Sequence, residues 1–178
     1  MAKKFVEHKT LNLTNVNNEV LDTWKEKDVF RKSVEEKEGC PEFIFFEGPP
    51  SANGHPGIHH VLARSLKDTF CRFKTMKGFQ VKRKAGWDTH GLPVELGVEK
   101  ELGITKEDIG TKISIEEYNR RCRENVMMYT SEWTDLSHKM GYWVDMENPY
   151  INYDNKYIET LWWLLKQLYN KDLLYKGY

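Results

Sequence analysis

The first forty residues are mostly polar but contain apolar positions at helical spacing. Asn17 and Asn18 precede this patch as possible helix caps. The pattern predicts an amino-terminal helical extension over residues 1–41, with its apolar positions at Val20, Leu21, Trp24, Val29 and Phe30.

The pattern changes at Glu42 to a short apolar run, Phe43–Phe46, which ends in Gly48-Pro49-Pro50. Such a run indicates a buried strand that closes into a turn. Apolar residues spaced by three and four then predict an amphipathic helix of about five turns that stops near Gly78. This stripe consists of Ile58, Val61, Leu62, Leu66, Phe70, Phe73 and Met76, while the other face carries Arg64, Lys67, Arg72 and Lys74.

Residues 79–84 can form the next strand, so strand, helix and strand follow in the order of a parallel crossover unit. The sequence therefore predicts an α/β fold in which residues 42–178 form half of a nucleotide-binding parallel sheet with helical additions. A loop at 86–93, a short helix and then a long helix follow. Ser114 and Glu117 are spaced as a capping box for the long helix, which we expect to reach about Met140.

A final helix should begin near Asp154. The last residues, 173–178, are apolar and aromatic and are typical of the start of another strand.

Composition narrows the possible functions. Lys plus Arg equals Asp plus Glu at 27 each, which argues against a free-standing RNA-binding protein. Hydrophobic residues make up 39% of the chain without a membrane-length apolar run or an apolar signal core, so we expect a soluble cytoplasmic protein. The three cysteines are odd in number and widely spaced, which indicates no disulfide framework.

The first candidate site is the segment from Gly48 to His60. Its glycines allow the backbone to approach a ligand, and it leads into a helix amino terminus, where phosphate is the natural ligand. Histidine can donate a hydrogen bond to phosphate as charge builds there. The relevant residues are Gly48, Gly54, Gly57, His55, His59 and His60. Alternatively, the histidines are ordinary loop residues, or H-x-x-x-H-H binds a metal ion with a further ligand.

The usual glycine-rich signatures are missing. The sequence contains no G-x-x-x-x-G-K-[ST] and no G-x-G-x-x-G after the first strand. Kinase, GTPase and dehydrogenase functions therefore lose most of their support.

The second candidate site is a loop with Trp87, Asp88 and His90 between Gly86 and Gly91. Here Asp88 could pair with a ligand ammonium group beside an aromatic wall. The alternative is structural: Trp87 is core, Asp88 caps the next helix and His90 satisfies a backbone carbonyl.

Together these segments resemble class I aminoacyl-tRNA synthetases, whose first strand is followed by G-P-P-x-A-[NT]-G-x-P-H-x-G-H. The sequence Gly-Trp-Asp-x-His-Gly-Leu-Pro at 86–93 is similar to the isoleucine branch. Residues 72–78, 142–145 and 157–163 extend the resemblance to nearly the whole chain.

One departure affects the nucleotide motif. H-x-G-H becomes Gly57-Ile58-His59-His60, so only His60 stays in register. In the family the motif's glycine lies against adenine, and we expect His59 to take over phosphate contact from the lost first histidine while Gly57 gives the loop room.

The resemblance implies a role for each motif residue. His60 and His59 would act in catalysis through phosphate contact, and Gly48, Gly54 and Gly57 would approach ATP. Isoleucine would be bound by Pro50, Trp87, Asp88 and His90. No protein-bound metal is expected, although Mg²⁺ would accompany ATP.

The implied parent activity is that of an isoleucine–tRNA ligase. It would activate L-isoleucine with ATP and pass the aminoacyl group to tRNA(Ile), as a monomer. The second half of the nucleotide-binding sheet, the K-M-S-K-S loop, the editing domain and the tRNA-binding region do not occur in the 178 residues, so we expect the chain to be inactive alone. The alternative is a non-catalytic, synthetase-like binding or regulatory module.

Overall fold

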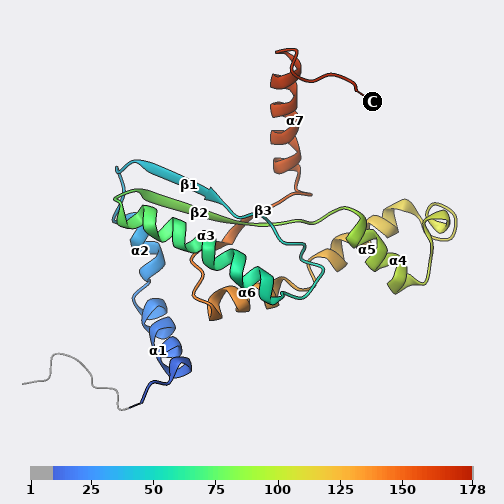
Figure 1. The fold of residues 1–178 in the computed structure, drawn as a ribbon. Coiled ribbons are helices and arrows are strands. Elements are labelled where there is room, and N and C mark those ends of the chain that lie inside the picture. The colour runs from blue at the N-terminus through green and yellow to red at the C-terminus, as the bar shows by residue number, and fades with distance from the viewer. Residues whose placement is uncertain (1–9, 178) are drawn as a thin grey trace, which may run out of the picture.

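The computed structural model describes residues 10–177, and its centre is a parallel three-stranded sheet in the order β1-β2-β3. Strand β1 (Glu42–Phe46) pairs with β2 (Gln80–Trp87), and β2 pairs with β3 (Asp145–Ile151). Helix α3 (Ile58–Met76) connects β1 to β2, which confirms the predicted parallel crossover and the α/β class. Figure 1 shows α3 lying along the sheet.

The amino-terminal helices differ from the prediction in their boundaries. Helix α1 (Leu13–Glu26) is capped by Asn12, whose side chain accepts a hydrogen bond from the Asn15 amide, so the prediction of Asn17 and Asn18 as caps is wrong. Asp28 has a φ of 51° and separates α1 from α2 (Val29–Glu35). The proposed boundary between an extension at 1–41 and a catalytic part at 42–178 stays a prediction.

The long helix predicted up to Met140 is in fact two helices, α5 (Ile115–Val126) and α6 (Thr130–Lys139). The Ser114 side chain caps α5 at the Glu117 amide, as expected. The helix breaks because the Tyr129 amide donates to the Ala52 carbonyl at 3.1 Å instead of closing a helical turn. This hydrogen bond therefore joins the segment between α5 and α6 to the loop after β1.

Helix α3 lies with its basic side, and not its apolar side, toward the rest of the chain. Arg64 is buried and donates to the Ser137 hydroxyl, while its guanidinium lies 4.9 Å from the Trp133 ring centre. The apolar stripe faces outward, with Ile58 83% exposed. Strand β1 is likewise only partly covered, so the expectation of a buried strand is wrong within the described residues.

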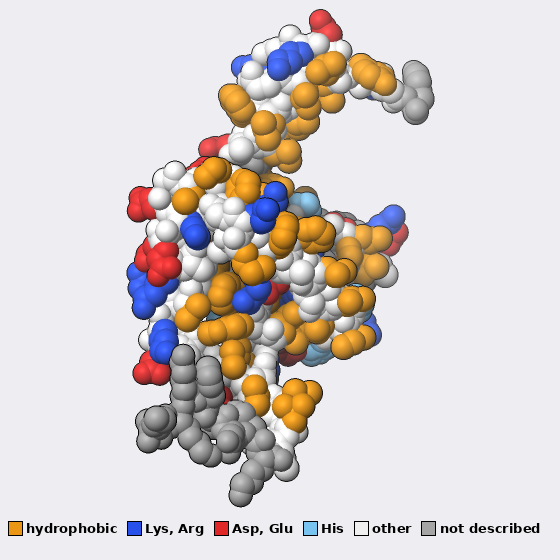
Figure 2. All heavy atoms as spheres, turned by 60° about the vertical axis from the view of Figure 1, so that its left-hand side comes forward, with side chains coloured by type: hydrophobic (Ala, Val, Ile, Leu, Met, Phe, Trp, Pro, Cys, Tyr) orange, Lys and Arg blue, Asp and Glu red, His pale blue; other side chains and the backbone are white. Residues whose placement is uncertain are grey.

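Helix α4 (Leu92–Leu102) packs against α5, and a 3₁₀ turn (Lys106–Asp108) lies between them in the chain. Helix α7 (Asn155–Tyr169) begins after Asp154, as predicted, and stands away from the sheet (Figure 1). Figure 2 shows hydrophobic side chains gathered along this projecting helix and over the body beneath it. Residues 173–177, expected to start a strand, form none in the described chain.

Strand β3 was missed because its sequence, Asp-Met-Glu-Asn-Pro-Tyr-Ile, lacks an apolar run and contains Pro149. Proline is tolerated here since β3 is an edge strand of the described sheet. Strand β3 leads directly into Asn152 at the carboxyl edge of the sheet.

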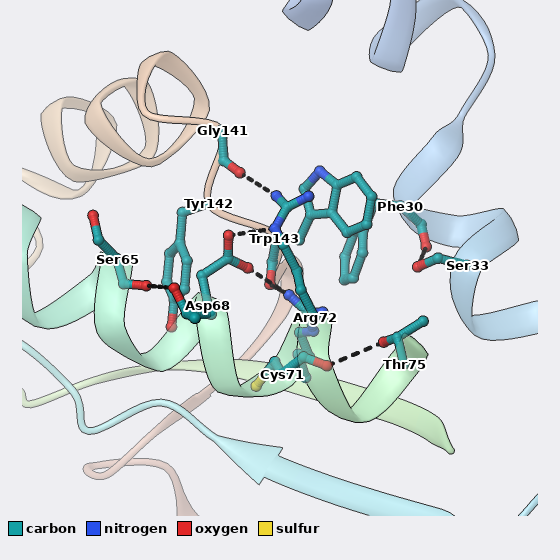
Figure 3. A network of polar contacts seen from close by, with 12 residues as sticks. Phe30, Ser33, Ser65, Asp68, Cys71, Arg72, Thr75, Gly141, Tyr142 and Trp143 are labelled. Carbon is teal, nitrogen blue, oxygen red and sulfur yellow. Dashed lines mark hydrogen bonds and ion pairs between the residues drawn. The ribbon is translucent and has the colours of Figure 1, made fainter. Parts of the chain in front are cut away.

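The first helices are attached through a cation–π cluster. The Arg72 guanidinium lies 3.7 Å from the centre of the Trp143 ring and donates to the Gly141 carbonyl at 2.8 Å (Figure 3). Trp24 of α1 meets Trp143 edge to face with ring centres 5.0 Å apart. The carboxylate of Asp68 binds both Arg72 and the buried Arg83. These contacts connect α1, α3 and the segment before β3.

Candidate active site

The segments that follow the three strands meet at one edge of the sheet. After β1, Ser51 forms a parallel bridge with Asp88, and the Asp88 amide donates to the Pro50 carbonyl at 3.1 Å. After β3, the Asn152 amide donates to the Trp87 carbonyl at 3.4 Å. Two predicted isoleucine-binding residues, Pro50 and Asp88, are therefore brought together at the position where open α/β sheets bind ligands.

The glycine-rich loop is held by helix α6. The Trp133 indole donates from Nε1 to the Gly54 carbonyl at 2.9 Å, and its ring packs with Ala52 and Trp87. His55 contacts Glu132 at 2.7 Å between Nδ1 and Oε2. Trp133 lies in a segment correctly expected to be helical, but its contact with the glycine-rich loop was not predicted from the sequence.

The histidine pair lies at the start of α3. Gly57 is the N-cap residue, and its amide donates to His60 Nδ1 at 2.9 Å. Because Nδ1 accepts this bond, neutral His60 carries its proton on Nε2, which can donate to an anion. The His59 and His60 rings lie 3.8 Å apart, and His60 meets Trp133 edge to face.

The altered motif has a local geometric explanation. A Cβ atom at Gly57 would lie 2.8 Å from His59 Cε1, closer than real side-chain contacts. The His59 ring thus occupies the space that a side chain at position 57 would need. Glycine at 57 and histidine at 59 are sterically compatible as a pair.

The pKa of His60 is lowered, first by burial and then by the positive charge of His59, Arg64 and Lys67. Because the folded-state pKa lies below the unfolded one, neutral His60 favours folding above about pH 6.5, and this contribution is lost as the pH falls toward the folded pKa. NMR titration should give a lower His60 pKa in the folded chain than in denaturing urea. His60→Gln should remove this contribution to the pH dependence of the free energy of unfolding. Equal pKa values of His60 in the folded and unfolded states would contradict the prediction.

Asp88 belongs to a hydrogen-bonded group with Asn152 and Thr89 that was not predicted from the sequence. Asp88 Oδ1 accepts from Asn152 Nδ2 at 3.0 Å, and Asn152 Oδ1 accepts from the Thr89 amide at 2.9 Å. Helix α4 is capped by Gly91, so the alternative that Asp88 caps the next helix is wrong. Asp88 is half-buried at this edge of the sheet.

Trp87 and His90 lie in different surroundings. Trp87 is buried in the core with Ala52 and Trp133, which agrees with the alternative prediction that it is a core residue. The exposed His90 lines a small cavity of about 140 Å³ with Tyr118 and Cys122. These positions give Trp87 and His90 weaker claims to ligand contact than Pro50 and Asp88.

Beneath the glycine-rich loop lies a buried ionic cluster around Glu47. Its carboxylate accepts from Lys67 Nζ and from the Tyr142 hydroxyl, and its backbone carbonyl accepts from the Tyr150 hydroxyl. Burial, followed by the interactions with Glu47, raises the pKa of Tyr142. In the sequence, the only sign that Glu47 has a structural role is its position as a charged residue directly after the apolar run Phe43–Phe46. The cluster ties the last residue before Gly48 to α3 and β3.

Within residues 10–177 no group of three or more His, Cys, Asp or Glu side chains is arranged to hold a metal ion. Over the same residues, no helix is both long and apolar enough to cross a membrane. Cys40, Cys71 and Cys122 are free thiols, and burial raises the pKa of Cys71 and Cys122.

Residues 19–178 match the family described as tRNA synthetases class I (I, L, M and V). The chain belongs to this class I synthetase family. Over its whole length it is 73% identical to the isoleucine–tRNA ligase of Bacteroides fragilis and 68% identical to that of Porphyromonas gingivalis. The corresponding enzyme of Clostridium acetobutylicum is 49% identical. The resemblance to the isoleucine branch is confirmed.

The chain covers 16% of the Bacteroides and Porphyromonas proteins and 17% of the Clostridium protein. Among solved structures, the LeuRS of Agrobacterium radiobacter K84, in a ternary complex with tRNA and LeuAMS, is similar with a TM-score of 0.59 and 22% identity. That match covers 89% of this chain and 18% of the other. It confirms the expected Rossmann-like fold of class I synthetases.

Proposed function

We propose that this chain forms part of the ATP and isoleucine site of an isoleucine–tRNA ligase. The observation that carries the proposal is that Pro50 and Asp88 are joined at one edge of the parallel sheet, with Trp133 packed against both Trp87 and His60. The chain spans about a sixth of its relatives, so the complete reaction would need further polypeptide.

The phosphates of ATP, with Mg²⁺ bound as part of the substrate, would lie at the start of α3. There the positive end of the helix dipole favours anions, and His60 presents Nε2–H as a donor. His59 would add a second contact from the same turn. The backbone at Gly48, Gly54 and Gly57 would lie along the nucleotide.

Isoleucine would bind through its ammonium group at Asp88, close to Pro50. Its carboxylate oxygen would attack the α-phosphorus of ATP, and pyrophosphate would leave. A ribose hydroxyl of tRNA(Ile) would later attack the carbonyl of the isoleucyl-adenylate and take the aminoacyl group, with AMP as the leaving group. No side-chain nucleophile is required, so the residues would act by positioning and by stabilising charge on the phosphates. His90 would support the loop beside Asp88, and Trp87 would support it from the core.

The exposed apolar surfaces agree with a chain that works as part of a larger polypeptide. Helix α3 exposes Leu62, Leu66 and Phe70, and one edge of β1 has no partner in the described sheet. Such surfaces are costly to leave in water. We expect the remaining part of a monomeric ligase to cover them.

Substituting Asp88→Ala should raise the KM for isoleucine about 100-fold, the effect expected when a charge-assisted ion pair is lost, with little change in the KM for ATP. The chain would be grafted into the Bacteroides fragilis ligase in place of the matching segment, and isoleucine-dependent ATP–pyrophosphate exchange would be measured. Asp135→Ala, at an exposed position on α6, serves as the control. An inactive graft would refute the proposed function and favour the non-catalytic binding module.

A further inference from the structure

Asn152 connects the carboxyl ends of β2 and β3 through its side-chain amide. Nδ2 donates to Asp88 Oδ1 at 3.0 Å, while Oδ1 accepts from the Thr89 amide at 2.9 Å and from the Thr89 hydroxyl at 2.6 Å. The Thr89 hydroxyl also accepts from the Tyr153 amide at 3.2 Å. The Asn152 side chain therefore contacts both Asp88, the residue proposed to bind the ammonium group, and Thr89, which follows it.

The orientation of this amide is determined by its partners. A backbone N–H can only donate, so the atom that faces the Thr89 amide must be the oxygen of Asn152. The Thr89 hydroxyl accepts from Tyr153 and directs its own proton to the same oxygen. The NH₂ group must then face Asp88, where an ionised carboxylate is its best acceptor.

The arrangement uses one oxygen of Asp88 and leaves the other without a protein hydrogen bond among residues 10–177. Thr89 is buried and the β3 end is joined to Trp87, so the amide is held on both sides. A carboxylate held in this way needs less reordering when it binds a cation.

We propose that Asn152 is a positioning residue that orients the Asp88 carboxylate toward the ammonium group of the amino-acid substrate. The proposal rests on the proposed function of Asp88. Asn152 itself does not contact the reacting atoms; it acts through Asp88 and sets the affinity for the amino acid without affecting the nucleotide site.

Asn152→Asp separates this role from a purely structural one. The new carboxylate can still accept from Thr89, but it loses the donor to Asp88 and places a second negative charge beside it. Two carboxylates at this distance raise the pKa of the pair, so one proton is retained to a higher pH. The retained proton lies between the two carboxylates and restores a donor to Asp88, so the loss of isoleucine binding should be smaller near about pH 6 than near about pH 8.

The variants would be measured in the grafted Bacteroides fragilis ligase by isoleucine-dependent ATP–pyrophosphate exchange. Asn152→Ala should raise the KM for isoleucine about tenfold or more, with the KM for ATP unchanged, because it removes a hydrogen bond to a charged group. Asn148→Ala and Asn148→Asp, at an exposed position on β3, provide matched controls and should leave both constants and the pH profile unchanged.

The outcomes distinguish a failure of the proposed function from a failure of the role of Asn152. An inactive graft with the unmodified chain would refute the proposed function itself. With an active graft, an unchanged isoleucine KM in Asn152→Ala would overturn the role of Asn152. Equal rises in the KM for isoleucine and ATP, or a pH-independent loss in Asn152→Asp, would also overturn it, since both results indicate general support of the fold.

Discussion

Trp133→Ala is expected to lower the free energy of unfolding by about 3–5 kcal/mol, the range found when a large buried aromatic is truncated. Trp133 is 2% exposed, and its ring supports Ala52 and Trp87 in one core cluster. It also donates to the Gly54 carbonyl and lies edge to face against His60. Urea unfolding followed by circular dichroism would measure the change.

Two further variants separate packing from hydrogen bonding at Trp133. Trp133→Phe keeps most of the ring but removes the indole N–H, so we expect a loss of about 1 kcal/mol with the core largely retained. Trp162→Ala is the matched control, because this tryptophan on α7 is 68% exposed. If Trp133→Ala cost no more than Trp162→Ala, the loop would not depend on α6 as described.

The second large effect is expected for Gly86→Ala. A Cβ atom at position 86 would lie 2.2 Å from the ring of Tyr150, the residue paired with it on β3. The ring cannot simply swing away, since its hydroxyl donates to the Glu47 carbonyl and its face stacks on Tyr157. We expect the strain of overpacking to cost about 1–3 kcal/mol in the free energy of unfolding, again measured with urea.

Gly54→Ala provides the control for this stability measurement. No atom lies within 4 Å of a Cβ at Gly54, and its backbone needs no positive φ. Repeating Gly86→Ala in a Tyr150→Ala background should reduce the cost, because the clashing ring is absent. An undiminished cost there would show that glycine at 86 is needed for another reason.

Helix α3 shows how a correct local prediction can lead to a wrong prediction of packing. The three-and-four spacing predicted the helix and its end near Gly78, and the structure has it at Ile58–Met76. Within this chain, however, the buried side is the one with Arg64 and Lys67. Burial of these charges is possible because Trp133, Ser137 and Glu47 offer ring faces and acceptors, all from segments distant in sequence.

The broken helix between Ser114 and Met140 has a similar explanation. The sequence indicated helix throughout, and the cap at Ser114 was predicted correctly. The interruption at Met127–Tyr129 arises from a hydrogen bond to Ala52, which lies more than seventy residues earlier. A local pattern contains no information about such a partner.

By itself, the sequence determined the parallel crossover and the position of the glycine-rich loop, because hydrophobic period and turn residues act over a few neighbours. The loop predicted at 86–93 was too long at both ends, since Gly86 and Trp87 belong to β2 and α4 begins at Leu92. The motifs in these loops also indicated the class I synthetase family. Only the tertiary structure decided that Asn152 holds Asp88, that Trp133 holds Gly54 and that the buried Glu47 accepts from Tyr142. Those contacts join residues 64, 79 and 95 positions apart, and their energy depends on three-dimensional geometry that local periodicity does not contain.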